Sequence, residues 1–180
     1  MRSALAAASL CIAICACSPQ QPAASASPTP ASTAARGRGP WLHITGNGTV
    51  RQPVHFVATA RDNREEYDLI ARSFESNGAQ GASVATFSLV HVTFYGNDGT
   101  LVSDSAQAIV DEMANTITLV GNVHARSSSG MTLSCDTLRY DRATQMVHGQ
   151  GHVVMTNARG MRATGDSVDT DITLTRARMQ

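Results

Sequence analysis

The chain has 180 residues, of which 42% are hydrophobic and 16% charged, a length that suits one folded domain with extensions. Its 14 basic and 14 acidic residues give a formal net charge of zero. A neutral domain lacks the basic surface that attracts nucleic acid, so nucleic acid is excluded as a partner. Aromatic residues make up only 4%, which is low for an enzyme-sized helical core but tolerable in a sheet built from Val, Ile, Leu, Thr and Met.

The N-terminus has the features of an export signal over residues 1–16. Arg2 supplies a positive charge, and the uncharged apolar run that follows is too short to span a bilayer well. The run ends in Ile-Cys-Ala-Cys, which resembles the lipobox of bacterial lipoproteins and predicts lipidation of Cys17. Cys15 departs from that motif, and a cleaved leader without lipid is the alternative. Several acyl chains on Cys17 would hold the protein stably at a membrane.

Residues 17–40 form a predicted disordered linker, because they are rich in Pro, Ala and Ser and have no apolar periodicity. The linker would separate the lipidated cysteine from a domain that we place at residues 41–180. Within that domain Cys135 has no second cysteine to pair with. We therefore expect its thiol to be buried as a small hydrophobe and not to act as a nucleophile or metal ligand.

Residues 41–100 carry strand and turn signals. Leu42 and Ile44 alternate before a Gly-Asn-Gly turn, which predicts a first hairpin or a docking strand, and residues 54–60 predict a second strand. A long strand follows residue 82 and ends at the Gly-Asn-Asp-Gly turn of residues 96–99. Its predicted inward face includes Val90, Val92 and Phe94.

Residues 61–76 allow two interpretations. An acidic first turn and the helical spacing of Tyr67, Ile70 and Phe74 are typical of a short helix. The same residues can form an extended segment with Tyr67, Leu69 and Ala71 on one face. The surrounding strand signals favour the extended interpretation.

Residues 101–180 contain one pattern that recurs at an interval of 30 residues. The recurring positions keep the same cyclic order and are Asp111, Asp141 and Asp171; Gly121 and Gly151; Val123 and Val153; Gly130 and Gly160; Met131 and Met161; Asp136 and Asp166. Similarity at a fixed period indicates stacked units that cannot bury their apolar face alone.

Each repeat predicts a strand, a turn, a second strand and another turn. Apolar and polar residues alternate, as in a strand covered on one side only. The inward positions of the two clearest strands are Ile117, Leu119, Val123, Val147, Val153 and Met155. Gly149 and Gly151 share that face, which predicts free space inside. Units stacked edge to edge would give a long sheet folded over on itself.

The titratable residues predict no catalytic, cofactor or metal site. His148 and His152 are about 13 Å apart along a strand, too far to bind one metal ion together. His124 lies on another strand and could approach one of them, but the sequence places no Cys or carboxylate beside the pair to complete a metal site. The recurring Asp111, Asp141 and Asp171 are better explained by turn hydrogen bonds than by a cation site. No nucleophile elbow or spaced carboxylate pair is present, so the chain is not predicted to be an enzyme.

Three segments together resemble the LptC family of periplasmic lipopolysaccharide-export proteins, and more distantly the LptA and OstA-like domains. They are YDLIARSFES, VTFYGNDGTLVSDSAQAIVDEMANTITLVGNV and GMTLSCDTLRYDRATQMVHGQGHVVM, within a resemblance that covers roughly residues 41–175. The order and spacing of these segments are more specific than any one of them.

The resemblance implies an all-β fold, a twisted and partly open β-jelly roll, or β-taco, built from stacked antiparallel strands. Its groove would shield the acyl chains of lipopolysaccharide. The implied partners are an inner-membrane ABC transporter and an LptA-like bridge protein joined by edge-strand addition. Many members are held by a transmembrane helix, whereas this leader resembles a lipoprotein signal. We therefore expect a periplasmic protein that is anchored in a membrane. The sequence leaves open whether that membrane is the inner or the outer one.

Two hypotheses follow. The first is glycolipid transport in an apolar groove lined by Val90, Val92, Phe94, Ile117, Leu119, Val123, Val147, Val153 and Met155. Burial of each acyl CH2 group contributes about 0.8 kcal/mol, so such a groove can bind a lipid tightly. The second is a repeat-built scaffold or surface lipoprotein that binds a protein through exposed β edges and has a packed core. The hypotheses differ in whether the interior admits lipid.

Overall fold

The computed structural model describes residues 42–60, 63–79 and 82–180. The chain divides into two units, Met1–Arg36 and Gly37–Gln180, and all described residues belong to the second. The described residues form strands and turns without a helix. The strands are β1 Leu42–Asn47, β2 Val54–Thr59, β3 Glu65–Ala71, β4 Ser73–Ala79, β5 Ala82–Tyr95, β6 Thr100–Asp111, β7 Thr116–Ser127, β8 Thr132–Asp141, β9 Met146–Thr156, β10 Arg162–Asp171 and β11 Arg178–Met179.

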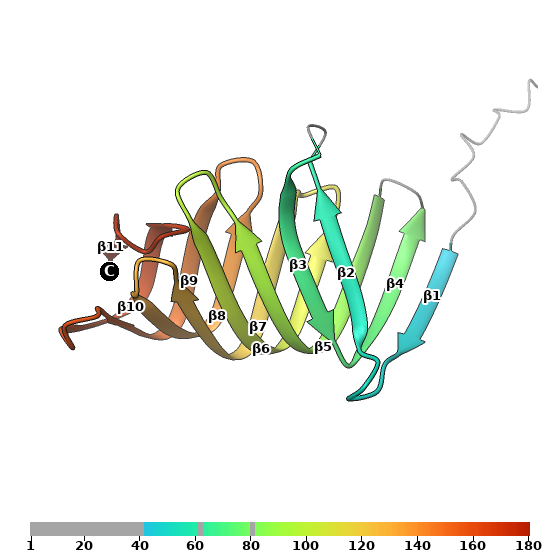
Figure 1. Ribbon diagram of the computed structural model, residues 1–180, viewed down its shortest axis with the longest axis horizontal. Coiled ribbons are helices and arrows are strands. Elements are labelled where there is room, and N and C mark those ends of the chain that lie inside the picture. Colours follow the sequence, from blue (N-terminus) through green and yellow to red (C-terminus); the bar gives the residue numbers. More distant parts are fainter. Residues whose placement is uncertain (1–41, 61–62, 80–81) are drawn as a thin grey trace, which may run out of the picture. The chain divides into compact units, whose positions relative to one another are not determined.

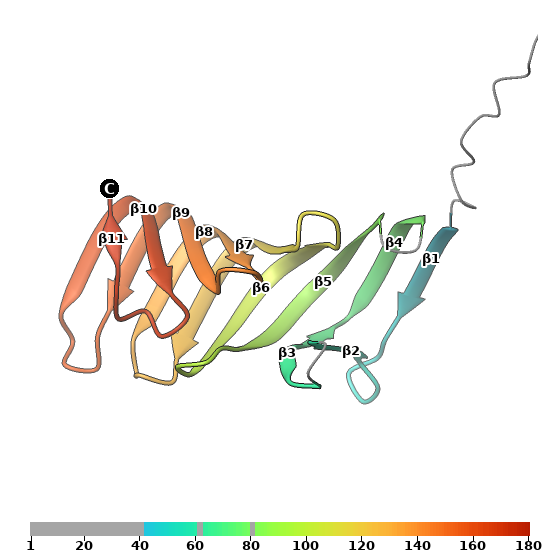
Figure 2. The same ribbon diagram turned by 90° about the horizontal axis from the view of Figure 1, so that it is seen from above.

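The eleven described strands make one antiparallel sheet in the order β1-β4-β5-β6-β7-β8-β9-β10-β11 (Figure 1). Strand β3 also pairs with β5, and β2 pairs with β3. Strands β3 and β4 pair with β5 in the same register, without a shift between them. They are therefore consecutive parts of one long partner strand that turns at Arg72. In Figure 2, β2 and β3 diverge from β1 and β4 beyond β5. The fold class is thus the expected all-β, partly open β-jelly roll.

The long strands are bent near their middles. Register shifts mark this bend between β6 and β7, between β7 and β8 and between β8 and β9. Gly121 and Asn122 have φ values of 84° and 49°, and Gly151 and His152 have values of 76° and 48°. Such bulges bend a strand and raise its twist, and glycine tolerates the positive φ that they need. The recurring Gly121 and Gly151 are therefore bend residues.

The bend divides the sheet into two halves that face each other. Half A contains β2, β3 and residues 90–105, 123–135 and 153–165, and half B contains β1, β4 and residues 82–88, 107–120, 137–150 and 167–171. Phe94 of half A and Tyr140 of half B have ring centroids 4.5 Å apart, although their strands are not neighbours in the sheet. One hydrophobic core cluster lies between the halves.

Residues 63–76, the described part of the segment 61–76, form strands and short connections and no helix. Glu65–Ala71 forms β3, with Tyr67, Leu69 and Ala71 buried as in the extended interpretation. Strand β3 hydrogen-bonds to β2 on one side and β5 on the other, which satisfies backbone groups that a helix would have satisfied internally. The Gly-Asn-Gly turn likewise does not close a hairpin, because β1 docks on β4 from Leu42↔Gly78 to Asn47↔Ser73.

The predicted space around Gly149 is absent. A Cβ atom at Gly149 would lie 2.8 Å from Cγ1 of Val168, so the neighbouring strand already occupies that position. A Cβ atom at Gly151 would lie 2.3 Å from Oδ2 of Asp136, which is at the bend. Parity along one strand could not show that side chains from adjacent strands fill the room that a glycine leaves.

Candidate functional site

The nine residues predicted to line a groove all lie in the interior of the bent sheet. Each is at most 4% exposed, and six of them are 0% exposed: Val92, Phe94, Ile117, Leu119, Val123 and Val147. They come from β5, β7 and β9 and from both halves of the sheet. The structure therefore brings them together in one core cluster.

Sequence reasoning missed the interior residues of β6 and, apart from Cys135, those of β8. In β8 the buried positions are Leu133 and Cys135 before the bend and Leu138 and Tyr140 after it. The parity changes because the bulge in the neighbouring strand sets two residues against the single residue Asp136. The recurring Asp136 and Asp166 were a usable signal, since both lie where the register shifts.

The interior opens at each end of the sheet. At the N-terminal end an apolar cavity of about 300 Å³ is lined by residues that include Ile44, Phe56, Phe74 and Phe87. The Phe87 ring stands 6.0 Å from the rings of both Phe56 and Phe74. Ile44 and Phe56 are 44% and 41% exposed, so apolar surface reaches solvent here.

A second apolar cavity of about 390 Å³ lies at the C-terminal end. Four of its lining residues are methionines, Met131, Met155, Met161 and Met179. Met155 is one of the nine predicted residues, so the interior is continuous with this cavity. Methionine side chains adapt to irregular apolar partners because they are unbranched and polarisable. The two ends thus frame a filled centre.

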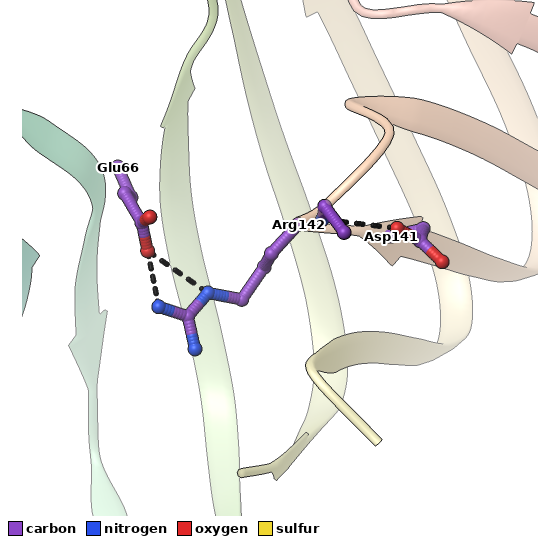
Figure 3. A network of polar contacts seen from close by, with 4 residues as sticks. Glu66, Asp141 and Arg142 are labelled. Atoms are coloured by element: carbon purple, nitrogen blue, oxygen red, sulfur yellow. Dashed lines mark hydrogen bonds and ion pairs between the residues drawn. The ribbon is translucent and has the colours of Figure 1, made fainter. Parts of the chain in front are cut away.

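Opposite the bend, the turns of the two halves meet along a seam. Lip A comprises residues 96–99, 128–131 and 157–161, and lip B comprises residues 112–115, 142–145 and 172–175. Arg142 of lip B reaches Glu66 on β3, beside lip A (Figure 3). Its Nε donates to Glu66 Oε2 over 3.0 Å, and its Nη2 donates to the same oxygen. The pair ties together segments that are 76 residues apart in the sequence.

Aromatic residues surround this ion pair. The guanidinium carbon of Arg142 lies 5.6 Å from the centre of the Tyr67 ring, within cation–π range. Burial raises the pKa of Tyr67 to about 12, although the nearby Arg142 opposes the shift. Burial likewise raises the pKa of Tyr140 to about 12. Both phenols are therefore neutral at physiological pH, and the cation over the Tyr67 ring is Arg142.

Two further hydrogen bonds cross the seam. The backbone N–H of Asn97 donates to the side-chain oxygen of Gln145 over 3.2 Å. The Ser129 hydroxyl donates to the backbone oxygen of Thr173 over 2.7 Å. Close packing accompanies them, since a Cβ atom at Gly96 would lie 2.8 Å from Cγ2 of Ile172. Among the described residues, the lips are thus held together by the Glu66–Arg142 ion pair, two hydrogen bonds and the packing of Ile172 against Gly96.

The recurring aspartates cap turns, as predicted. Asp141 Oδ1 accepts hydrogen bonds from the backbone N–H groups of Ala143 and Thr144 over 3.0 and 2.9 Å. Asp111 accepts one from Ala114, and Asp171 accepts one from Thr175, each over 2.9 Å. The hydrogen bonds to Asp141, led by that from the Thr144 N–H, lower its pKa. Each aspartate therefore serves its own turn.

The histidines of the repeats lie apart on the outer surface. His148 donates to Asp169 over 2.5 Å, and His152 donates to Asp136 over 2.7 Å. His124 is hydrogen-bonded to the Ser134 hydroxyl instead. Among the described residues no three His, Cys, Asp or Glu side chains form a group that could hold a metal ion.

Cys135 is a buried free thiol, as expected. Its exposure is 5%, and burial raises the pKa of the thiol to about 11. Because the thiolate is the reactive form of cysteine, this side chain is an inert part of the core.

The predicted signal peptide (residues 1–16), Cys17 and the linker to residue 40 lie outside the described residues, as does Trp41. In the part of the chain that is described, no helix has the length and apolarity needed to cross a membrane.

Comparison with known proteins gives a single family. No curated protein matches the chain. The model of the family described as "Lipopolysaccharide-assembly, LptC-related" matches residues 49–178, which include nine of the eleven strands described above in full, β2 to β10. This family consists of periplasm-facing transport proteins and not of enzymes. The chain belongs to the LptC-related family of lipopolysaccharide-assembly proteins, and its role is in lipopolysaccharide transport.

Proposed function

We propose that the chain binds the acyl chains of lipopolysaccharide between the two halves of its bent sheet and passes them along a protein bridge from an inner-membrane ABC transporter. The observation that carries this proposal is the apolar interior, which runs from the aromatic cavity at one end to the methionine cavity at the other. Acyl chains gain free energy from contact with apolar side chains along such a path, in steps of about 0.8 kcal/mol per buried CH2 group.

The ends of the sheet fit partners that add strands. At the C-terminal end, β11 pairs with Val168 and Asp169 of β10, and Gln180 hydrogen-bonds to Asp166 and Ser167. Residues 162–165 of β10 have no outer strand neighbour among the described residues. Unpaired edge groups bind an added strand through main-chain hydrogen bonds. We infer that an LptA-like bridge protein and the transporter bind at such edges by strand addition.

A lipid on Cys17 would anchor the domain in the periplasm through the linker of residues 17–40. Intact-mass measurement of the protein from membranes tests this assignment, with Cys17→Ser as the control. Added mass of a diacylglyceryl group and an acyl chain, lost in the variant, supports the anchor, and an unmodified mature chain contradicts it. Separation of the two membranes then identifies the one that holds the anchor.

Site-specific photocrosslinking tests lipid binding. Benzoylphenylalanine replaces Phe94, which is 0% exposed inside, or Thr93, the adjacent residue on the opposite face of β5, in the full chain in a lipopolysaccharide-producing bacterium. We expect an adduct detected by an anti-lipopolysaccharide antibody from position 94 and not from position 93. Equal adducts, or none from position 94 in a folded protein, would contradict the proposal.

A second function remains supported by one observation. The nine interior residues are at most 4% exposed, as in a core that is simply packed. A scaffold lipoprotein that binds a partner protein through its β edges would have such an interior. Absence of a lipid adduct at position 94, together with protein crosslinks from β10, would favour this alternative.

A further inference from the structure

The closed interior raises the question of how a lipid enters it. The core residues between the halves leave no passage, because the nine side chains of the predicted groove are at most 4% exposed. Beyond the two end cavities, a chain of CH2 groups can enter the filled centre only when halves A and B move apart, since protein interiors are close-packed. The halves are joined at two places, the bend and the seam.

The bend joins the two halves through the backbone, so this connection persists when the halves move apart. The backbones of the long strands run through it, and the hydrogen-bonded sheet continues on both sides of each register shift. Bulge residues with positive φ, such as Gly121 and Gly151, set the angle there. A change of angle at the bend keeps every strand pair intact, so the bend can act as a hinge line.

The seam is the weaker connection. Its ion pair is partly exposed, with side-chain exposures of 19% for Arg142 and 27% for Glu66. Water can replace both partners of such a pair, so its net contribution to the free energy of closure is small. The Asn97–Gln145 and Ser129–Thr173 hydrogen bonds also exchange for water when the lips part.

The surroundings of the ion pair also suit repeated opening. The pair lies over a polar cavity of about 320 Å³ that Asn97, Ala143 and Thr144 help to line, so water is within reach of both charges. The Tyr67 ring beneath Arg142 holds the guanidinium in place while the seam is closed. No covalent bond or strand pairing crosses the two lips among the described residues.

We propose that the Glu66–Arg142 pair and the two neighbouring hydrogen bonds form a releasable latch, and that acyl chains load sideways through the opened seam. This inference rests on the proposed function, because it concerns the route into the same interior. Sideways loading leaves the two ends of the sheet free for protein partners. It also lets the polar head of a lipid stay at the wet lips while its acyl chains enter.

A crosslink across the seam tests the route. The full chain carries benzoylphenylalanine at Phe94 and two new cysteines, Asn97→Cys and Ala143→Cys, on opposite lips. It is purified in a mild non-ionic detergent, stripped of lipid and treated with bis-maleimidoethane. Cys135 does not compete for the reagent, because it is buried and its pKa is raised to about 11. Lipopolysaccharide is then added, and adducts are measured after irradiation.

The matched control carries Val154→Cys and Thr164→Cys. These residues are cross-strand partners within half A, so the same reagent joins β9 to β10 without bridging the lips. Each protein is also measured without the reagent, and circular dichroism verifies that the crosslinked proteins remain folded.

We expect the seam crosslink to lower the adduct yield at least tenfold and the control crosslink to leave it unchanged. Equal yields from the seam-crosslinked and untreated protein would overturn sideways loading, because lipid would then enter through the ends. If the protein without crosslinks gives no adduct either, lipid binding itself fails, and the proposed function falls together with this inference.

Discussion

Arg142 donates two hydrogen bonds to one oxygen of Glu66 and makes a cation–π contact with the ring of Tyr67, the residue next to Glu66. One cation thus contacts two consecutive residues of β3 from the turn between β8 and β9. This contact joins the third strand of the chain to a turn of the repeats, and it closes the fold at the side opposite its bend.

The variants Glu66→Gln and Arg142→Gln measure this contact. We expect Glu66→Gln to lower the free energy of unfolding by less than about 1 kcal/mol, because the pair is partly exposed. Arg142→Gln should cost more, since it also removes the cation–π contact. Urea unfolding of the single and double variants gives the coupling energy. Strictly additive effects would contradict a direct interaction.

Gly151→Ala and Gly160→Ala separate backbone strain from a side-chain clash. Both glycines have positive φ, 76° and 82°. A Cβ atom meets Asp136 at position 151 and nothing within 4 Å at position 160. We expect a loss of about 1 kcal/mol at position 160 from strain alone, and about 1 to 2 kcal/mol more at position 151 from the clash. Equal losses by urea unfolding would show that Asp136 moves away without cost.

Thr170→Val should stabilise the protein. Thr170 is 0% exposed, and its hydroxyl oxygen has no hydrogen-bond partner among the described residues. Replacement of an unsatisfied buried hydroxyl by a methyl group should raise the free energy of unfolding by about 1 kcal/mol. The control is Thr173→Val. The Thr173 hydroxyl is hydrogen-bonded to Asp171 and to the Thr175 hydroxyl, so its removal should lower the free energy of unfolding. A loss of stability in Thr170→Val would mean that its hydroxyl is satisfied by water.

His152 should titrate above its ordinary pKa of 6.5, because its hydrogen bond to Asp136 stabilises the charged ring. Because the pKa of His152 is higher in the folded than in the unfolded state, protonation of this ring stabilises the fold. The full contribution is present at pH values below the unfolded-state pKa, and it is lost as the pH rises through the folded-state pKa. NMR titration of the ring protons measures the shift. Asp136→Asn should bring the pKa back toward 6.5, and an unchanged value in that variant would point to a different cause.

The local patterns of the sequence determined the strands, their inward faces and the turn chemistry. Alternation placed Ile117, Leu119, Val147 and Val153 on the buried face, and the recurring aspartates were recognisable as turn caps. These features depend on residues a few positions apart, whose spacing is set by the pleat of a strand or the geometry of a turn. The repeat also indicated that units stack in a sheet that folds over.

Only the tertiary structure decided how the folded sheet closes. The docking of β1 on β4 and the filling of the Gly149 position by Val168 depend on which strands are neighbours in the sheet. The contact between Glu66 and Arg142 depends on which halves face each other and at what angle. That angle is set jointly by the bulges of several strands, and a bulge also reverses the parity of an unbulged neighbour such as β8. Period-two alternation carries no information about these long-range relations, because it describes each strand by itself.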